Sequence, residues 1–255
     1  MIYVTGDIHS DPRRLNTESF PEQKEMTRDD FVIILGDFGL VWSNEPTKQE
    51  KYWLDWLDGK PFTTLFIDGN HDNFYALNNM FEEVDFHSGK AHKIRDNIYH
   101  LMRGYVFELC GKKIFAFGGA SSHDIQDGIL DPGDYPSNED FQRVYNQWRK
   151  QNKSFRVRGV SWWDEELPLE EEMQRGIQSL KDCGNEVDFI ISHCCPQQIA
   201  SIFSNGIYKP DILTSYFNDI MDDNKFTRWF FGHYHDNRQI MGKFIMIYEQ
   251  IIRIA

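Results

Sequence analysis

Carboxylate, amide and imidazole groups follow several short apolar segments of the sequence, each at the point where the segment ends. Asp7 and His9 follow the first of these segments, and His233 and His235 follow the last. The members of each pair are two positions apart, which places both side chains on one side of an extended backbone. Side chains of these types bind divalent ions such as Mn, Zn, Fe and Ni, so their recurrence indicates a metal site. The further groups in equivalent positions are Asp37, Asn70, His71 and His193.

The apolar segments themselves are predicted to be buried strands. They are short, rich in β-branched and aromatic residues, and bounded by Gly, Asp or His. Because sites in open α/β sheets form beyond the carboxyl ends of strands, we expect the polar groups to converge there. A glycine precedes several of them, which allows the backbone to turn sharply and to approach a ligand closely. The predicted strands span residues 2–7, 31–37, 64–71, 114–119, 187–193 and 228–233.

The rest of the pattern predicts a single α/β domain over residues 1–255. Helices are expected over Lys48–Leu57 and Pro168–Lys181. Residues 99–119 are predicted to form a hairpin that turns at Cys110-Gly111-Lys112, and residues 244–254 a strand pair or one long edge strand. Strands that alternate with helices at first, and with hairpins afterwards, indicate a mixed α/β sandwich.

One region, residues 121–163, departs from this pattern. Its apolar periodicity fades, and Gly, Pro, Asp, Asn and Arg become frequent over a length that is unusual for a connection. We therefore expect a lid or an inserted subdomain over the site. Its basic residues either receive a second phosphate or a phosphodiester strand, or form the solvated face of an amphipathic helix over residues 139–150. They are Arg143, Arg149, Lys150, Lys153, Arg156 and Arg158.

Composition narrows the choice of partners. The net charge of −13 argues against long nucleic acid and anionic membranes, because both are bound largely through Lys and Arg. Phosphate chemistry stays compatible with an acidic chain where metal cations reverse the local sign. The four cysteines show no C-x-x-C spacing, which favours reduced thiols, and no uninterrupted apolar stretch approaches 18 residues. We expect a cytoplasmic protein without membrane contact that acts on a small phosphorylated or nucleotide-like molecule.

The ordered polar motifs resemble those of the calcineurin-like metallophosphoesterases. That family has Gly-Asp-x-His, Gly-Asp, Gly-Asn-His-Asp/Glu, a lone His and Gly-His-x-His. The complete ordered set is far more specific than any one block, and it spans residues 6–235. The five matching blocks are Gly6-Asp7-Ile8-His9, Gly36-Asp37, Gly69-Asn70-His71-Asp72, Ser192-His193 and Gly232-His233-Tyr234-His235.

The resemblance implies a four-layer αββα sandwich with two central mixed β-sheets and a dinuclear metal centre. Mn is the expected metal, with Zn, Fe and Ni as alternatives. Two such ions clamp the attacking and leaving oxygens of an in-line displacement, and a hydroxide formed from metal-bound water would attack phosphorus. The implied ligands are Asp7, His9 and His235 for the first ion, Asn70, His193 and His233 for the second, and Asp37 as the bridge.

The same resemblance assigns catalytic roles outside the ligand set. His71 would protonate the departing alkoxide or donate to the phosphoryl oxygens. The family's carboxylate partner of this histidine is missing, and Asp72 or Asp68 is expected to orient it instead. The Ser/Thr protein phosphatases of the family have a carboxylate and a phosphate-binding Arg where this chain has Leu40 and Asp68. These departures favour a small or nucleotide-like phosphomonoester or phosphodiester over a phosphoprotein. A Ser/Thr-type phosphoprotein phosphatase and a non-catalytic metal-binding scaffold are the alternatives.

Several other residues have both a functional and a structural interpretation. His123 follows a predicted strand directly and could face the site as a substrate contact. Trp163, with its neighbour Trp162, could stack on a nucleobase or anchor a loop on the core. Cys194 and Cys195 adjoin a candidate ligand, and we expect them to be small buried apolar residues. Three further histidines, expected to be surface or structural residues, are His87, His92 and His100.

Overall fold

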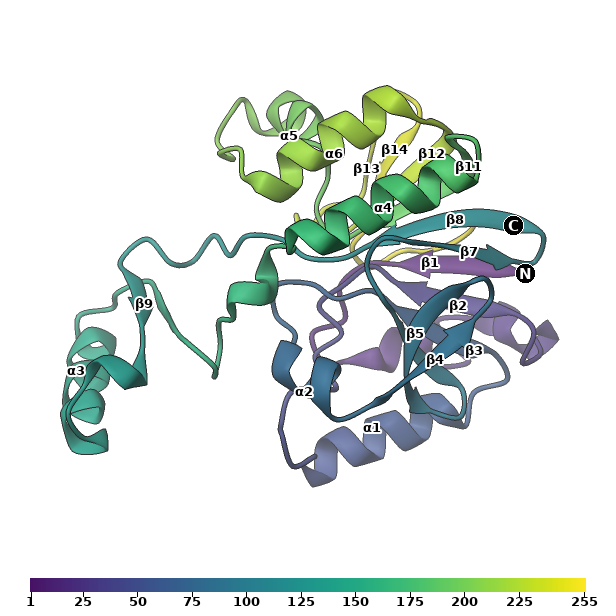
Figure 1. Cartoon of the computed structure of the whole chain (residues 1–255). Coiled ribbons are helices and arrows are strands. Elements are labelled where there is room, and N and C mark those ends of the chain that lie inside the picture. Colours follow the sequence, from purple (N-terminus) through teal and green to yellow (C-terminus); the bar gives the residue numbers. More distant parts are fainter.

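The computed structural model describes all residues, 1–255, and shows two β-sheets stacked between layers of helices (Figure 1). The first sheet has seven strands. Four neighbouring strands are parallel. One strand on one side of them and two strands on the other side pair in the antiparallel direction. In spatial order the strands are β15 (Ile251–Arg253), β1 (Ile2–Thr5), β2 (Phe31–Ile34), β3 (Thr63–Phe66), β6 (Ile98–Leu101), β5 (Gly89–Arg95) and β4 (Glu82–Phe86).

The second sheet has six strands and is also mixed. Four neighbouring strands are parallel, and an antiparallel strand closes each edge. In spatial order the strands are β13 (Arg238–Ile240), β14 (Phe244–Met246), β12 (Lys225–Phe231), β11 (Glu186–Ser192), β8 (Lys112–Phe117) and β7 (Tyr105–Leu109).

Alternating side chains divide the core into three layers. On β1, Ile2 and Val4 enter the cluster between the two sheets, whereas Tyr3 packs on the opposite side with the helices. On β8, Ile114 faces the other sheet and Phe115 faces outward. This alternation is the period of two expected of strands that are buried on both faces, and it explains why their sequences are apolar throughout.

Helices cover the outer face of each sheet. Leu54 and Leu77 belong to the cluster outside the first sheet, and Leu180 and Phe217 to the one outside the second. The resulting helix–sheet–sheet–helix order confirms the predicted four-layer αββα sandwich with two mixed sheets. The helices are α1 (Lys48–Asp58) and α2 (Phe74–Asn79) on the first sheet, and α4 (Glu170–Asp182), α5 (Gln197–Ser204) and α6 (Ile212–Asp223) on the second. Short 3-10 turns follow β1 at Pro12–Leu15 and Pro21–Glu25.

Both predicted helices are present within two residues of their expected bounds. Helix α1 begins after a capping box, in which the Thr47 hydroxyl accepts from the Glu50 N–H at 3.2 Å and the Glu50 carboxylate accepts from the Thr47 N–H at 2.7 Å. Glu50 also accepts from the N–H of Trp42, which fixes the loop between β2 and α1. No helix of the chain combines the length and the apolar composition needed to cross a membrane.

One prediction about strand pairing is confirmed in part and another is wrong. The hairpin turns at Cys110 and Gly111 as predicted, but it consists of β7 and β8 alone, because β6 lies in the first sheet. Residues 244–254 form neither a strand pair nor one long strand, because β14 and β15 lie in different sheets. An apolar stretch shows that a strand is buried but not which sheet receives it. The β4–β5 hairpin was not expected at all.

Residues 121–163 form most of an arm that projects from the sandwich (Figure 1). The arm has a small apolar cluster of its own, built around Leu130, Phe141 and Val157. Ser137 caps its helix by accepting from the Asp140 N–H at 3.2 Å, and acidic residues in the first turn and basic residues in the last complement the helix dipole. Its elements are β9 (Gly128–Leu130), the 3-10 turns at Pro132–Asp134 and Asp164–Glu166, α3 (Asn138–Lys150) and β10 (Phe155–Val157), which pairs with β9 in parallel.

Candidate active site

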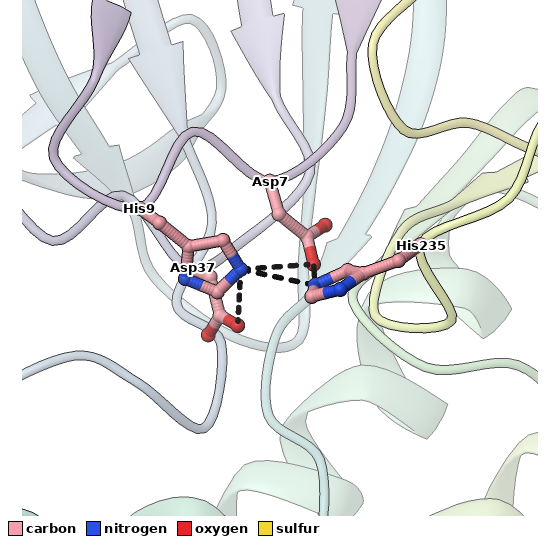
Figure 2. A group of neighbouring side chains, drawn as sticks. All are labelled: Asp7, His9, Asp37 and His235. Atoms are coloured by element: carbon pink, nitrogen blue, oxygen red, sulfur yellow. Dashed lines mark hydrogen bonds and ion pairs between the residues drawn. The ribbon is translucent and has the colours of Figure 1, made fainter.

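Four of the predicted ligands meet where β1 and β2 end. The ligand atoms of Asp7, His9, Asp37 and His235 all lie within 4.8 Å of one another. Figure 2 shows the two carboxylates and the two imidazoles pointing toward a common point from separate segments of the chain. The carboxylate side chains are 0% and 2% exposed, whereas the two rings reach solvent. The cluster is therefore anchored in the core and open on one side.

The charges of this cluster fit a divalent cation. His235 Nε2 lies 3.1 Å from Asp7 Oδ2, and His9 Nε2 lies 3.7 Å from Asp37 Oδ2. Neither buried carboxylate forms an ion pair with a lysine or an arginine, so only imidazoles offset their charge. Buried charges without a counter-charge are costly unless they are paired or coordinate a metal, and this donor set matches a cation of the transition series.

A second group of donors lies on the other side of Asp37. His193 Nε2 is 3.4 Å from Asp37 Oδ1 and 3.2 Å from Asn70 Oδ1. His193 Nδ1 donates to the Leu35 carbonyl at 2.7 Å, which fixes the ring and directs Nε2 at the cluster. Asp37 thus presents Oδ2 to one group and Oδ1 to the other, which is the arrangement that a bridging carboxylate requires.

The electrostatics of His193 reflect these acidic neighbours. Burial acts to lower the pKa of His193, but the charges of Asp37 and Asp7 outweigh it and raise the pKa to about 10. The same contacts keep the pKa of Asp37 well below its ordinary value despite burial. The site therefore attracts positive charge strongly, and metal binding to such ligands releases protons.

His233 joins the second group through its neighbours. Its ring centroid lies 5.0 Å from that of His193, and its backbone N–H donates to Asp7 Oδ1 at 3.0 Å. His233 Nε2 lies 2.8 Å from Nε2 of His123, so His123 faces this side of the cluster. The His123 ring also packs on Tyr208, with 4.7 Å between the ring centroids. The structure therefore brings together all seven predicted ligands and His123.

The backbone at the ligands is held in an uncommon conformation. His9, Asp37, His233 and His235 have φ angles of 43°, 46°, 67° and 51°. Such left-handed conformations cost about 1–3 kcal/mol each for residues with a Cβ, and they concentrate at functional sites where the surroundings enforce them. The loops after three different strands all show this feature, which indicates that geometry at the site prevails over local backbone preference.

Two glycines of the motifs are required by close approach. A Cβ on Gly69 would lie 2.1 Å from Asp37 Oδ1, and a Cβ on Gly232 would lie 2.1 Å from Asp7 Oδ1. Only a residue without a side chain lets these backbones pass so near the two buried carboxylates. These glycines therefore allow the loops to pack closely around the two acidic groups.

His71 stands at the edge of the cluster. Its backbone N–H donates to Asp37 Oδ1 at 2.7 Å, and its Nε2 lies 3.4 Å from Nη2 of Arg156 in the arm. Burial lowers the pKa of His71, and the Arg156 charge acts in the same direction while Asp37 opposes both. The imidazole faces the arm, so a group that enters between the arm and the cluster meets His71.

Neither carboxylate proposed to orient His71 contacts its ring. Asp72 is buried and accepts from the backbone N–H of Gly39 at 2.9 Å and of Gly69 at 2.8 Å, so it ties the loops after β2 and β3 together. Asp68 is buried too, and it binds Arg103 at 2.5 Å and His100 at 3.1 Å. Both residues support the loops that carry the ligands. His100 in turn contacts His92, as expected of structural histidines.

Trp163 lies apart from the metal cluster. It is 6% exposed and packs edge-on against Trp42, with 5.3 Å between the ring centroids, and against Phe74. The structure favours the interpretation that Trp163 anchors a loop on the core, because little of its ring is available for stacking on a nucleobase. Cys194 and Cys195 are buried in the core, as predicted.

One supporting residue, Glu166, was missed. Its carboxylate accepts from the Ser122 N–H at 3.0 Å and from the Ser122 hydroxyl at 2.8 Å, and the Ser122 hydroxyl accepts from Asn70 Nδ2 at 3.2 Å. This chain of hydrogen bonds turns the Asn70 oxygen toward His193. Burial raises the pKa of Glu166 to about 8, although Ser122 acts to lower it. No local pattern separates Glu166 from its acidic neighbours in the sequence.

A four-layer sandwich with carboxylate, amide and imidazole groups at its strand ends is the architecture of the metallophosphoesterases. A family model described as calcineurin-like phosphoesterase matches residues 1–237. The chain therefore belongs to the calcineurin-like phosphoesterase family.

Other comparisons are more distant. No curated protein matches the chain. Among solved structures, the chain is similar to the 2.05 Å crystal structure of a candidate 5′-nucleotidase from Staphylococcus aureus in complex with α-ketoglutarate, with a TM-score of 0.46 and 12% sequence identity. That alignment covers 97% of this chain and 48% of the other, so this chain spans about half the length of its structural neighbour.

Proposed function

We propose that this protein is a phosphoric ester hydrolase that cleaves a small or nucleotide-like phosphomonoester or phosphodiester with the help of two divalent cations. Asp7, His9 and His235 would hold one cation, and a second group of side chains would hold the other. Asp37 would bridge them. That second group is Asn70, His193 and His233. The observation that carries the proposal is the placement of the two Asp37 oxygens, 3.7 Å from His9 Nε2 and 3.4 Å from His193 Nε2.

Bound cations would supply an acidified water as the nucleophile and would offset charge on the phosphoryl oxygens. Residues of the chain do the remaining work. His71 lies beside Asp37 and is open to the arm, where it can donate a proton to the departing oxygen. His123 lies against His233 on the opposite side, where it can donate to a phosphoryl oxygen. Mn is the metal we propose, in a cytoplasmic protein.

A small substrate is supported by the surroundings of the site. Asp68 is fully engaged by Arg103 and His100, so the position before Gly69 supports the loop and offers no phosphate-binding group. The cationic group nearest His71 comes instead from Arg156 in the arm. The position that binds phosphate in the family's protein phosphatases therefore provides no cation here, which favours a small substrate over a phosphoprotein.

The test is a substrate and metal panel. Protein stripped with EDTA should be inactive on p-nitrophenyl phosphate and bis-(p-nitrophenyl) phosphate, and Mn, Zn, Ni or Mg should be compared for restoring hydrolysis. Metal analysis should give two ions per chain in the active form. A phosphopeptide assayed in parallel separates a phosphoprotein phosphatase from the proposed activity. Full activity with a single bound ion, or a clear preference for the phosphopeptide, would contradict the proposal.

A further inference from the structure

A groove of about 870 Å³ lies between the arm and the loop that follows β2. Trp42 supplies the wall on the side of the sandwich, and residues of α3, of β10 and of the arm segments beside them supply the rest. The groove is larger than the hollow beside His123, which measures about 470 Å³. Its volume suits a ligand well beyond a single phosphate group.

The basic residues of the groove are the first reason to expect an anionic ligand. Arg149, Lys153 and Arg156 all line it, in a chain with a net charge of −13. Arg149 and Lys153 form no ion pair, so their charges have no acidic partner. Arg156 pairs with Asp124, which lines the same groove and faces solvent. Two cations without an acidic partner in one hollow of an acidic protein favour binding of an anion.

The aromatic residues are the second reason, because they favour a planar group. Tyr145 and Phe155 pack edge-on in the arm, with 5.6 Å between their ring centroids, and both line the groove. Trp42 is half-buried opposite them and is held in place by Trp163. Aromatic side chains beside cationic ones are the combination on which nucleobases stack and phosphates bind.

The groove opens onto the proposed acid of the reaction. Arg156 lines the groove, and its Nη2 lies 3.4 Å from His71 Nε2. If His71 protonates the departing oxygen, the leaving group extends from His71 toward Arg156 and into the groove. Arg156 then stands at the junction, within reach of both the phosphoryl group and the leaving group.

We propose that the groove is the leaving-group subsite and that the leaving group is a nucleotide, with a base against the aromatic wall and a second phosphate against Arg149 and Lys153. The substrate is then a nucleoside that carries a phosphate in addition to the ester being cleaved. Hydrolysis breaks one P–O bond of that ester, water supplies the hydroxyl to phosphorus, and the proton goes to the leaving oxygen. This inference rests on the proposed function.

The first experiment measures binding without turnover. Adenosine 3′,5′-bisphosphate and the dinucleotide pApA are titrated by calorimetry into the full chain in EDTA, with adenosine as the uncharged reference. We expect both phosphorylated probes to bind. The Arg149→Ala/Lys153→Ala variant should bind them with an affinity lower by about tenfold or more, because charge-assisted hydrogen bonds are lost. The matched control is Arg143→Ala/Lys150→Ala, which removes two charges from the same helix outside the groove. Equal losses in both double variants would overturn the proposal.

The second experiment measures selectivity with metals bound. We expect kcat/KM of the wild type to be at least about tenfold higher for a nucleotide probe than for p-nitrophenyl phosphate, and Arg149→Ala/Lys153→Ala to remove that preference. A preference for pApA assigns the groove to the nucleotide of a phosphodiester, and a preference for the bisphosphate assigns it to a nucleoside bisphosphate. No preference for either probe would overturn the subsite. Failure to hydrolyse any ester, with binding in EDTA intact, would refute the proposed function alone.

Discussion

Arg156 Nη2 lies 3.4 Å from His71 Nε2, although the two residues are 85 positions apart in the chain. The contact joins the projecting arm to the loop that carries Asn70, and so links the arm to the proposed reaction centre. In this chain no arginine precedes the Gly69-Asn70-His71 block. Asp68 occupies that position and binds Arg103. The arm therefore returns a cation to the neighbourhood of His71 from a different part of the sequence.

Replacing Arg156 should distinguish a direct contact between its side chain and the phosphoryl group from a general effect of positive charge. We expect Arg156→Ala to lower kcat/KM for p-nitrophenyl phosphate by about ten- to a hundredfold, because a charge-assisted contact to the phosphoryl group is lost. Arg156→Lys should recover part of the loss by restoring a charge without the planar fork. Arg158→Ala is the control, since Arg158 pairs with Asp131 and Asp164 away from His71. If Arg158→Ala reduces activity as much as Arg156→Ala does, the effect is not specific to Arg156 and the proposed contact with the phosphoryl group is wrong.

Metal binding should stabilise the protein through Asp37. A ligand that binds only the folded state, at a free concentration of about 100 times its Kd, adds about 2.7 kcal/mol to the free energy of unfolding. We expect Mn²⁺ to raise the Tm of the wild type and to leave that of Asp37→Asn nearly unchanged, because the bridge loses its charge. Thermal unfolding followed by circular dichroism, with and without EDTA, gives the comparison. Asp85→Asn, at an exposed carboxylate of β4, is the control. A similar Mn²⁺-induced rise in Asp37→Asn would exclude the bridging role.

The sequence allowed the strand-end groups to be predicted because the signal is local. Asp7, Asp37 and His193 each end an apolar run, and parallel strands bring such ends to one edge of a sheet. The fold class followed from the same runs together with the motif resemblance. The pairing partners of the strands could not be predicted from the sequence, because β14 and β15 are similar apolar strands that enter different sheets. Only tertiary packing decides where each one goes.

The supporting contacts were beyond prediction for a different reason. Glu166 acts on Asn70 through Ser122, and Ser122 is 52 positions from Asn70 and 44 from Glu166. Asp72 was one of the two carboxylates expected to orient His71, yet its side chain accepts from the amides of Gly39 and Gly69. Adjacency in the sequence therefore does not determine which groups the side chain of a loop residue contacts.

Gly69 offers a test of how closely the loops are packed around the acidic groups. A methyl group there would meet Asp37 Oδ1 at 2.1 Å, so Gly69→Ala must displace either the carboxylate or the loop. We expect metal affinity to fall by about tenfold or more, with a loss of activity that excess metal restores in part. Gly59→Ala is the control, since its added methyl would contact nothing nearer than 3.4 Å. Unchanged metal affinity in Gly69→Ala would show that the loop tolerates the methyl group.

The buried carboxyl group of Glu166 should make stability depend on pH. Its pKa rises from the ordinary value of 4.5 to about 8 in the folded protein, because burial disfavours the charged form. Between these two values the folded state holds a proton that the unfolded state has released. The free energy of unfolding therefore falls as the pH rises through this window, and the contribution of the protonated group is complete only below the lower value.

Glu166→Gln removes that titration while keeping a side chain that can hydrogen-bond to Ser122. In EDTA, we expect the Tm of the wild type to fall relative to that of Glu166→Gln as the pH rises from about 5 to about 8.5, because only the wild type loses its proton there. Differential scanning calorimetry of both proteins at matched ionic strength gives the difference directly, and shifts common to both cancel. A difference in Tm that stays constant across this range would mean that Glu166 is already ionised in the folded protein, with its charge balanced by the Ser122 hydrogen bonds.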